Sequence, residues 1–429
     1  MFTAVAAPLQ ASPNDLSGGT GAARPTASTV GMNPANAALV PRTEISAAPN
    51  LFEKNTLKIR YPGFEPLEKS STGIGDITSW MPSFVFKVNE DLGVGGYAVP
   101  PVTVEREYTK VPIVVLGALD TVDIKAKVSL KGAFGGTFGY ALSQRMAVGL
   151  QVGYAGYGLQ ADALPSSGGA TLATIYLDSS TFDVKSGLTF DVIPGRFRLG
   201  ASFGLFAMQK TSTRIDSALL NAGGGAGGAA GGQSSSSAGV PLNRILVGMA
   251  ARLGSRLSLF ADVEYNRAGA GAKDFSFVEL AEKEKDVYST VAPRIAAELG
   301  LTPRMSLLAS FRYQPANVGA GGRGDGSKAG YGSREIIGVF TGTEQLTPFW
   351  AMSGGLRHEF GRISRQRRNA DEGKSPSSGG VRSRSIAKWL LAYGVVYQRG
   401  SLGIDENGEL PGAYLQTKIS VPLEIVYRF

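Results

Sequence analysis

Apolar and polar residues alternate along the last sixteen residues of the chain. Positions of one parity, from Leu415 to Phe429, are almost all apolar, whereas the other parity includes Lys418, Glu424 and Arg428. A period of two is the pattern of a β-strand with one apolar and one polar face. The pattern therefore predicts a strand over 414–429 that ends on an aromatic residue.

The same period recurs along the chain from Thr43 onward, so we expect about fourteen strands. An even number of strands is usual for single-chain bacterial β-barrels of the outer membrane. The expected strands are 44–52, 81–89, 92–99, 122–142, 146–158, 181–193, 197–211, 242–253, 256–268, 288–301, 304–315, 346–361, 385–400 and 414–429.

The connections between these strands alternate in length. Turns of two or three residues are expected at 90–91, 143–145, 194–195, 254–255 and 302–303. Long stretches separate the resulting hairpins, at 53–80, 100–121, 159–180, 212–241, 269–287 and 316–345. Short periplasmic turns and long outer loops are typical of membrane β-barrels. The alternation therefore places both ends of the strand region on the periplasmic side.

The fold class that follows is all-β, a transmembrane antiparallel barrel of about fourteen strands. The chain has no run of about 18 apolar residues, which excludes a helical membrane span. A charge on the lipid face at the middle of the bilayer costs roughly 2 to 4 kcal/mol. The alternate positions that carry the charged residues of each strand are therefore expected to face the lumen. Several runs exceed the roughly 9 to 11 residues needed for a crossing, so the barrel should extend above the membrane.

Composition narrows the function classes. The chain has 58 glycines, no cysteine and a net charge of +8, with basic and acidic residues spread along its length. Such spreading does not indicate nucleic-acid binding, and the lack of cysteine excludes thiolate metal sites. His358 is the only histidine, and it falls on an apolar strand face near the inner interface. We therefore expect no enzyme activity, no metal site and no cofactor.

The N-terminal region divides into two expected parts before the barrel, which is assigned to residues 43–429. Residues 1–11 (MFTAVAAPLQA) resemble the end of a signal peptide with small residues at its cleavage site, the alternative being a plain flexible terminus. Residues 12–42 are rich in Gly and Ala and lack strand alternation. Asn33 followed by Pro34 favours a turn there, with one helical turn after it.

Three segments carry a family resemblance, namely 19–39 (GTGAARPTASTVGMNPANAAL), 82–101 (PSFVFKVNEDLGVGGYAVPP) and 122–154. They resemble the FadL-type outer-membrane transporters of long-chain fatty acids and other hydrophobic compounds. The local similarity is confined to the first third of the chain. The resemblance implies that 12–42 form a plug, or hatch, inside the lumen of a barrel in the outer membrane of a Gram-negative bacterium.

The resemblance also implies positions for a gate. Asn33, Pro34 and Ala35 match the motif that lies in the gate of the family's plug, and Gly93, Gly95 and Gly96 fall where the third strand kinks to open the wall. Family members release ligand sideways through that opening. An alternative explanation for the three glycines is close packing on the lumen side.

A carboxylate ligand would need a cation near the outer mouth of the barrel. The candidates are Lys125 and Lys127, assigned to the lumen face, followed by Lys185 and Arg312. The alternative is that these cations pair with nearby acidic residues such as Asp183 or Glu264.

Two further features concern partners. The expected turn at 362–384 is unusually long and basic, and Arg365, Arg367 and Arg368 are candidates for contact with an acidic periplasmic or secretion partner or with anionic lipid. The alternative is a solvated turn. Phe429 is expected to act as the membrane-insertion signal that the barrel assembly machinery reads.

Two functions remain open at this point. The first is a passive channel for hydrophobic small molecules with lateral release into outer-membrane lipid. The second is an interaction barrel, like the FadL-like component of a secretion shuttle. A general porin fits less well because of the plug. The sequence leaves the cargo and the movement of the plug undecided.

Overall fold

The computed structural model describes residues 25–60, 65–73, 82–99, 101–115, 118–166, 169, 171–217, 230–237, 244–266, 272–276, 281–285, 289–315, 349–364, 385–404 and 412–429. Two short helical turns precede the strands, η2 (Ala27–Thr29) and α2 (Asn36–Leu39). None of the helices in these ranges is long and apolar enough to cross a membrane.

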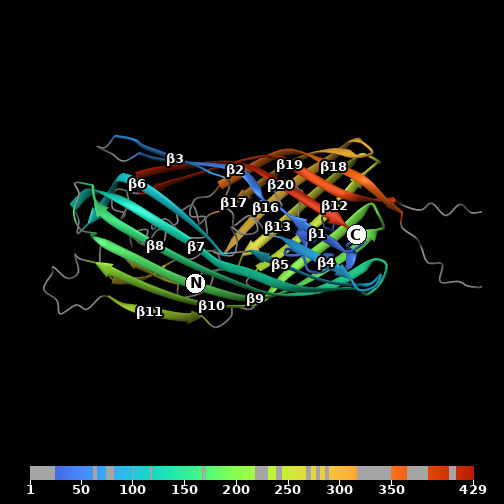
Figure 1. Cartoon of the computed structure of the whole chain (residues 1–429), viewed down its shortest axis with the longest axis horizontal. Coiled ribbons are helices and arrows are strands. Elements are labelled where there is room, and N and C mark those ends of the chain that lie inside the picture. The colour runs from blue at the N-terminus through green and yellow to red at the C-terminus, as the bar shows by residue number, and fades with distance from the viewer. Residues whose placement is uncertain are drawn as a thin grey trace, which may run out of the picture.

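The strands form a closed antiparallel barrel of 14 strands, as predicted, and Figure 1 shows them inclined along one cylinder. The first, second, third and eighth strands of the wall are each divided into two segments. The strands are β1 (Glu44–Ala47), β2 (Asn50–Arg60), β3 (Leu67–Gly73), β4 (Ser83–Lys87), β5 (Leu92–Val99), β6 (Val102–Val115), β7 (Ala118–Ala141), β8 (Met146–Pro165), β9 (Ala173–Ile193), β10 (Phe197–Ser217), β11 (Ala230–Ser237), β12 (Arg244–Leu253), β13 (Leu257–Asn266), β16 (Thr290–Thr302), β17 (Met305–Gln314), β18 (Phe349–Ser364), β19 (Ser385–Ile404) and β20 (Gly412–Arg428). A separate hairpin pairs β14 (Ala272–Ser276) with β15 (Ala281–Lys285).

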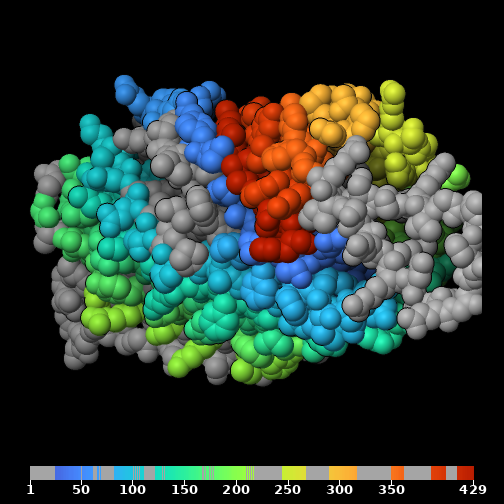
Figure 2. All heavy atoms as spheres, turned by 45° about the vertical axis from the view of Figure 1, so that its right-hand side comes forward, coloured from blue at the N-terminus to red at the C-terminus, as the bar shows by residue number. Residues whose placement is uncertain are grey.

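The barrel closes between its first and last strands. β1 and β2 pair successively with β20, in registers that include Glu44↔Arg428 and Ile59↔Tyr414. In the space-filling view, red residues near the C-terminus lie directly against blue residues of the first strand (Figure 2). This pairing confirms that the terminal strand completes the cylinder, which leaves no free sheet edge there.

The predicted sidedness is confirmed for β13 and β17. In β17, Leu307 and Tyr313 are exposed on the outer face, whereas Leu308 and Arg312 are buried on the inner face. In β13, Leu259 and Val263 likewise face outward. The charged parity therefore points into the barrel, as the cost of charge in lipid requires.

The wall extends well beyond its apolar outer belt. On β7, exposed aromatic residues reach from Tyr140 up to Phe134, which lies against Tyr154 of β8 with ring centroids 5.4 Å apart. Above this level Lys131 pairs with Asp178, and β7 continues to Ala118. The residues beyond Lys131, 118–130, span about 40 Å along the strand. The barrel thus rises far above its apolar belt, as expected.

Part of the stretches predicted as long loops is strand. β2 extends to Arg60, and β3, β6 and β11 lie within 53–80, 100–121 and 212–241. Figure 1 shows these segments at the end of the cylinder away from the C-terminus. Above the membrane both faces of a strand can contact water, so alternate positions need not be apolar. The sequences of these segments therefore resemble those of loops. The short predicted turns are all confirmed between paired strands.

An ion pair lies at the closing seam. The Arg428 Nε lies 2.6 Å from Glu44 Oε1, and the Glu44 side chain is fully buried. Removing one partner of a buried pair leaves the other charge without compensation, which costs more than the net value of the pair.

We expect Arg428→Leu to lower the free energy of unfolding by about 3 to 5 kcal/mol, measured by urea titration of heat-modifiable gel mobility. The control is Lys58→Leu, which removes an exposed pair with Glu68 at 2.8 Å and should cost less than about 1 kcal/mol. Equal losses in the two variants would contradict a special role for the seam.

Candidate functional site

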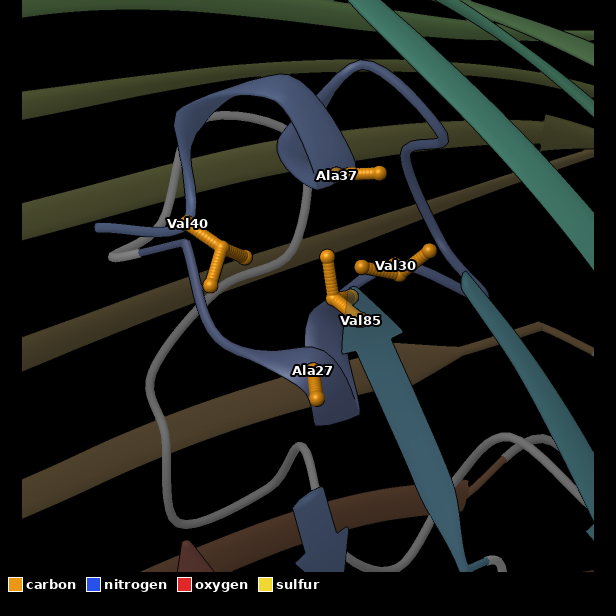
Figure 3. Packing of buried hydrophobic residues seen from close by; sticks show 5 residues of the cluster. All are labelled: Ala27, Val30, Ala37, Val40 and Val85. Atoms are coloured by element: carbon orange, nitrogen blue, oxygen red, sulfur yellow. The ribbon is translucent and has the colours of Figure 1, made fainter. Parts of the chain in front are cut away.

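Residues 25–40, here called the inner segment, pack against the inner face of the barrel. Ala27, Val30, Ala37 and Val40 form a buried apolar cluster with Val85 of β4. Figure 3 shows their side chains converging between the two helical turns and the strand. α2 also contacts β5, β7 and β8. The inner segment therefore lies in the lumen at the end of the barrel that holds the C-terminus, and the assignment of 12–42 to a plug stays a prediction.

Carboxylates at the closing seam hold one side of the inner segment. The backbone N–H of Ala27 donates to Glu44 Oε2 at 3.0 Å, and the Ser28 hydroxyl donates to Glu424. Glu424 is also buried, and Glu44 is the residue paired with Arg428. The same seam that closes the barrel thus anchors the segment.

The Asn33-Pro34-Ala35 motif contacts the opposite wall. Asn33 Nδ2 donates to the Leu188 carbonyl at 3.2 Å and lies 3.3 Å from the Thr189 hydroxyl, both on β9. The Asn33 Oδ1 accepts the backbone N–H of Ala35 at 3.1 Å, which stabilises the turn before α2. The motif is therefore a wall contact; its predicted part in a gate stays a prediction.

Four glycines on the inner face form a row that seats this turn. Paired positions Gly93, Gly139, Gly149 and Gly187 lie side by side on β5, β7, β8 and β9. A Cβ at Gly149 would lie 2.3 Å from the Pro34 carbonyl carbon, and one at Gly187 would lie 2.1 Å from Asn33 Oδ1. Only residues without a side chain allow the segment to approach this closely.

The glycines of the third strand have distinct surroundings. A Cβ at Gly93 would meet the Ala37 carbonyl oxygen at 2.0 Å, so this glycine belongs to the seat. Gly95 lies against the backbone of Phe84, and the Phe84 ring packs over Gly96. β5 pairs with β4 and β7 without a register shift through all three glycines. The interruption of the third strand comes later, after Val99.

The described strand pairing stops where the third strand breaks. β4 pairs with β1 only as far as Ser46↔Ser83, and β3 pairs with β2 only from Glu53↔Gly73 upward. In the described residues β6 pairs with β7 alone and has no strand pairing to β3. Residues 47–52 thus lack a described partner strand on this side, and residues 74–81, between β3 and β4, lie outside the described residues. We call this stretch without described pairing the wall gap.

The strand break coincides with two prolines in the sequence. Pro100 and Pro101 separate β5 from β6, and a proline has no N–H to continue a ladder. The two prolines directly follow the predicted strand 92–99, so the sequence indicates where that strand ends.

Beside the break lies an apolar patch on the inner wall. It consists of Val99, Ala133 and Ala155, with the rings of Tyr97 and Tyr157 packed against it. Tyr97 also lies across Gly135, where a Cβ would approach its ring to 2.4 Å. The patch borders the end of β5, so an apolar surface adjoins the gap. Its residues come from β5, β7 and β8, so the sequence gives no local signal of the patch.

The assignment of Lys125 and Lys127 to the lumen face was wrong. Val122, Ile124 and Ala126 are buried instead, and the two lysines are more than half exposed. A bulge between Leu130 and Gly132, where Gly132 has φ +122°, inserts one residue into β7 and reverses its alternation. The lysines pair with Glu107 at 3.3 Å and Glu105 at 3.1 Å.

The other two head-group candidates do face inward. Lys185 is largely buried and lies 3.2 Å from Asp183, which matches the alternative expectation of an ion pair. The guanidinium carbon of Arg312 lies 5.2 Å from the centre of the Phe349 ring. Their predicted contact with a ligand stays a prediction.

The remaining candidate residues lie on or next to the last strands of the barrel or outside the described residues. His358 stacks on Tyr393 of β19 with ring centres 5.8 Å apart, and the part of the chain that the structure covers has no group of His, Asp and Glu residues arranged to hold a metal. Phe429 is exposed and packs edge-on against Tyr427. Arg365, Arg367 and Arg368 lie outside the described residues.

The glycine seat can be tested by adding single methyl groups. We expect Gly149→Ala and Gly187→Ala to displace the inner segment, because the new Cβ atoms would overlap it, and such overpacking costs about 1 to 3 kcal/mol. Single-channel conductance and protease sensitivity of the inner segment should both rise. Gly136→Ala is the control, since no atom lies within 4 Å of its Cβ position. An unchanged conductance in both seat variants would contradict the seat.

Comparisons with known proteins agree with this geometry. A scan against protein-family models found no match, and a search of curated protein sequences found none either. Among solved structures the chain is similar to a FadL homologue of Pseudomonas aeruginosa, with a TM-score of 0.58, 13% identity and coverage of 94% of each chain. It is similar to the Pseudomonas putida toluene transporter TodX, with a TM-score of 0.58, 13% identity and coverage of 97% of this chain and 98% of that one.

A third structure extends the comparison to another genus. The toluene transporter TbuX of Ralstonia pickettii has a TM-score of 0.52 and 11% identity, and 97% of each chain is covered. The coverage is nearly complete in every case, so the likeness extends over almost the whole chain. The chain therefore has the fold of the FadL-type outer-membrane barrels.

Proposed function

We propose that this protein is a passive outer-membrane channel through which hydrophobic compounds enter a Gram-negative cell. The observation that carries the proposal is the juxtaposition of three features: a segment seated in the lumen, the end of the described strand pairing after Val99, and an apolar patch between them. The FadL homologue and the toluene transporters share the fold, which supports the same class of cargo.

The wall gap would serve as a lateral exit. An apolar molecule gains nothing by passing from the lumen to the aqueous periplasm, since each buried methylene favours a lipid environment by about 0.8 kcal/mol. Leaving through the wall keeps the cargo in contact with apolar surface, first with Val99 and the Tyr97 ring and then with lipid. The gap is bounded by the described ends of β3, β4 and β5.

The inner segment would block the direct path to the periplasm. Its buried contacts with the seam carboxylates and with the glycine row hold it on two opposite sides of the lumen. Such a segment closes the end of the channel while leaving the wall gap above it. Asn33, Pro34 and Ala35, which touch the glycine row, are the residues we propose for the gate.

Charge in the lumen favours an uncharged cargo or one with a weakly held head group. Lys185 is paired with Asp183, and Arg244 lies 2.8 Å from Glu264, so these cations are already neutralised. We therefore propose hydrophobic compounds in general as cargo, with long-chain fatty acids and small aromatic hydrocarbons as the two classes to compare.

A cross-link tests whether the inner segment must move. Ala35 and Ala147 pack in one buried cluster, and the chain has no cysteine of its own. We expect the double variant Ala35→Cys and Ala147→Cys to lose most uptake of labelled oleate or toluene when oxidised and to recover it on reduction. Each single variant is a control. Full uptake in the cross-linked protein would show that the segment stays fixed during transport.

Closing the strand break tests lateral exit. Replacing Pro100 and Pro101 by Val and Thr restores two backbone donors, so the third strand should continue and narrow the gap. We expect severalfold slower uptake, with barrel folding retained on heat-modifiability gels. Pro293→Val, in the continuously paired β16, is the matched control and should not change uptake.

The outcomes separate the hypotheses. If the wild-type barrel transports neither probe above an empty-vector background, the channel proposal fails and the interaction barrel becomes the better hypothesis. If transport occurs but the proline replacement leaves it unchanged, the channel stands and the lateral route fails.

A further inference from the structure

Four consecutive hairpin turns at the C-terminal end of the barrel carry an arginine at the same position. In each case the arginine is the residue directly before the first residue of a strand, namely Met146, Phe197, Leu257 or Met305. The four residues, here called the arginine arc, are Arg145, Arg196, Arg256 and Arg304.

The same backbone bond fixes each residue of the arc. The N–H of Asp191 donates to the Arg145 carbonyl at 2.7 Å, and that of Arg252 donates to the Arg196 carbonyl at 2.7 Å. Gly300 and Glu359 donate in the same way to the other two, at 2.7 and 2.8 Å. Each donor lies on the next strand around the wall. The arginines therefore lie at one level, with neighbours two strands or about 10 Å apart.

The arc differs in charge pairing from many other cations of the barrel. The ion pairs elsewhere join basic side chains to acidic partners within 4 Å, on both the inner face and the outer extension of the wall. In the described residues no side-chain hydrogen bond or ion pair involves any guanidinium of the arc, and all four residues are exposed. Four like charges thus remain uncompensated along one rim.

An exposed aliphatic residue accompanies each arginine. Leu142, Ile193, Leu253 and Leu301 precede the four turns, and between 43% and 52% of each is exposed. The rim therefore repeats one unit four times, an apolar side chain at the edge of the belt followed by an unpaired guanidinium. An apolar group beside a cation suits the boundary between acyl chains and head groups.

The remaining described turn of this rim is different. The turn between β4 and β5 has Asn89, Glu90 and Asp91 in place of an arginine, and Lys87 donates to the Glu90 carbonyl at 3.1 Å. This turn lies below the broken second and third strands. The basic arc thus covers the continuously paired part of the wall and leaves out the side with the wall gap.

We propose that the arginine arc binds the phosphate groups of anionic phospholipids in the periplasmic leaflet. Guanidinium groups match phosphate oxygens with two parallel hydrogen bonds, and basic residues near a membrane surface attract anionic lipids. Lipid fits better than an acidic protein, because the charges are spread along an arc and each adjoins an exposed aliphatic residue. The leaflet assignment rests on the proposed orientation in the outer membrane.

Lipid selectivity at the barrel surface tests this proposal without any transport measurement. The wild-type barrel is reconstituted in phosphatidylcholine vesicles with a trace of spin-labelled phosphatidylglycerol or phosphatidylcholine. We expect a severalfold preference for phosphatidylglycerol among the motionally restricted lipids, and its loss in the variant with Arg145, Arg196, Arg256 and Arg304 all replaced by Gln. Raising the salt concentration to 1 M should also weaken the preference in the wild type.

A matched variant separates the arc from net charge. Replacing Lys125, Lys127, Lys131 and Arg214 by Gln removes the same charge from ion-paired positions far from this rim, and it should retain the lipid preference. Heat-modifiable mobility confirms folding of both variants. Equal association of the two lipids with the wild type, or equal loss in the two variants, would overturn the proposal. Either result leaves the channel proposal unaffected, because uptake is measured separately.

Discussion

Backbone hydrogen bonding in lipid is the constraint on which this structure depends. A sheet inside a bilayer has no water to satisfy the donors and acceptors at its edges, so the only stable sheet is one that closes on itself. Here closure requires β1 and β2 to lie beside β20. The inner segment leads directly into β1, so closure also brings that segment to the seam, where Glu44 and Glu424 bind it.

The same constraint applies to the break in the third strand. Above Val99 the described pairing between the second and third strands stops, whereas the third strand remains paired with β7. Such a break is tolerated where the freed backbone groups line a cavity or lie above the apolar belt. The apolar patch of Val99, Ala133 and Ala155 adjoins the break, which relates the missing pairing to a path for apolar molecules. The break in the third strand is therefore the feature of the fold on which the proposed lateral exit depends.

Glycine has two different uses in this barrel. Gly93, Gly139, Gly149 and Gly187 remove side chains so that the inner segment can approach the wall, and each would clash with it if a Cβ were present. Gly132 has a positive φ that accommodates a bulge and reverses the faces of β7. The sequence shows the high glycine content, but only the three-dimensional neighbours distinguish a seat from a bulge.

The sequence by itself determined the class of fold, the number of strands, the short turns and the inward direction of most charged residues. These follow from the period of two, because lipid imposes it on every strand that crosses the bilayer. It also indicated the Asn33-Pro34 turn. The tertiary structure decided what local pattern cannot contain: the lengths of strands above the membrane, the outward turn of Lys125 and Lys127, the glycine seat and the wall gap. Each of these depends on which residues lie opposite one another across strands or across the lumen, and a one-residue bulge is enough to change that pairing.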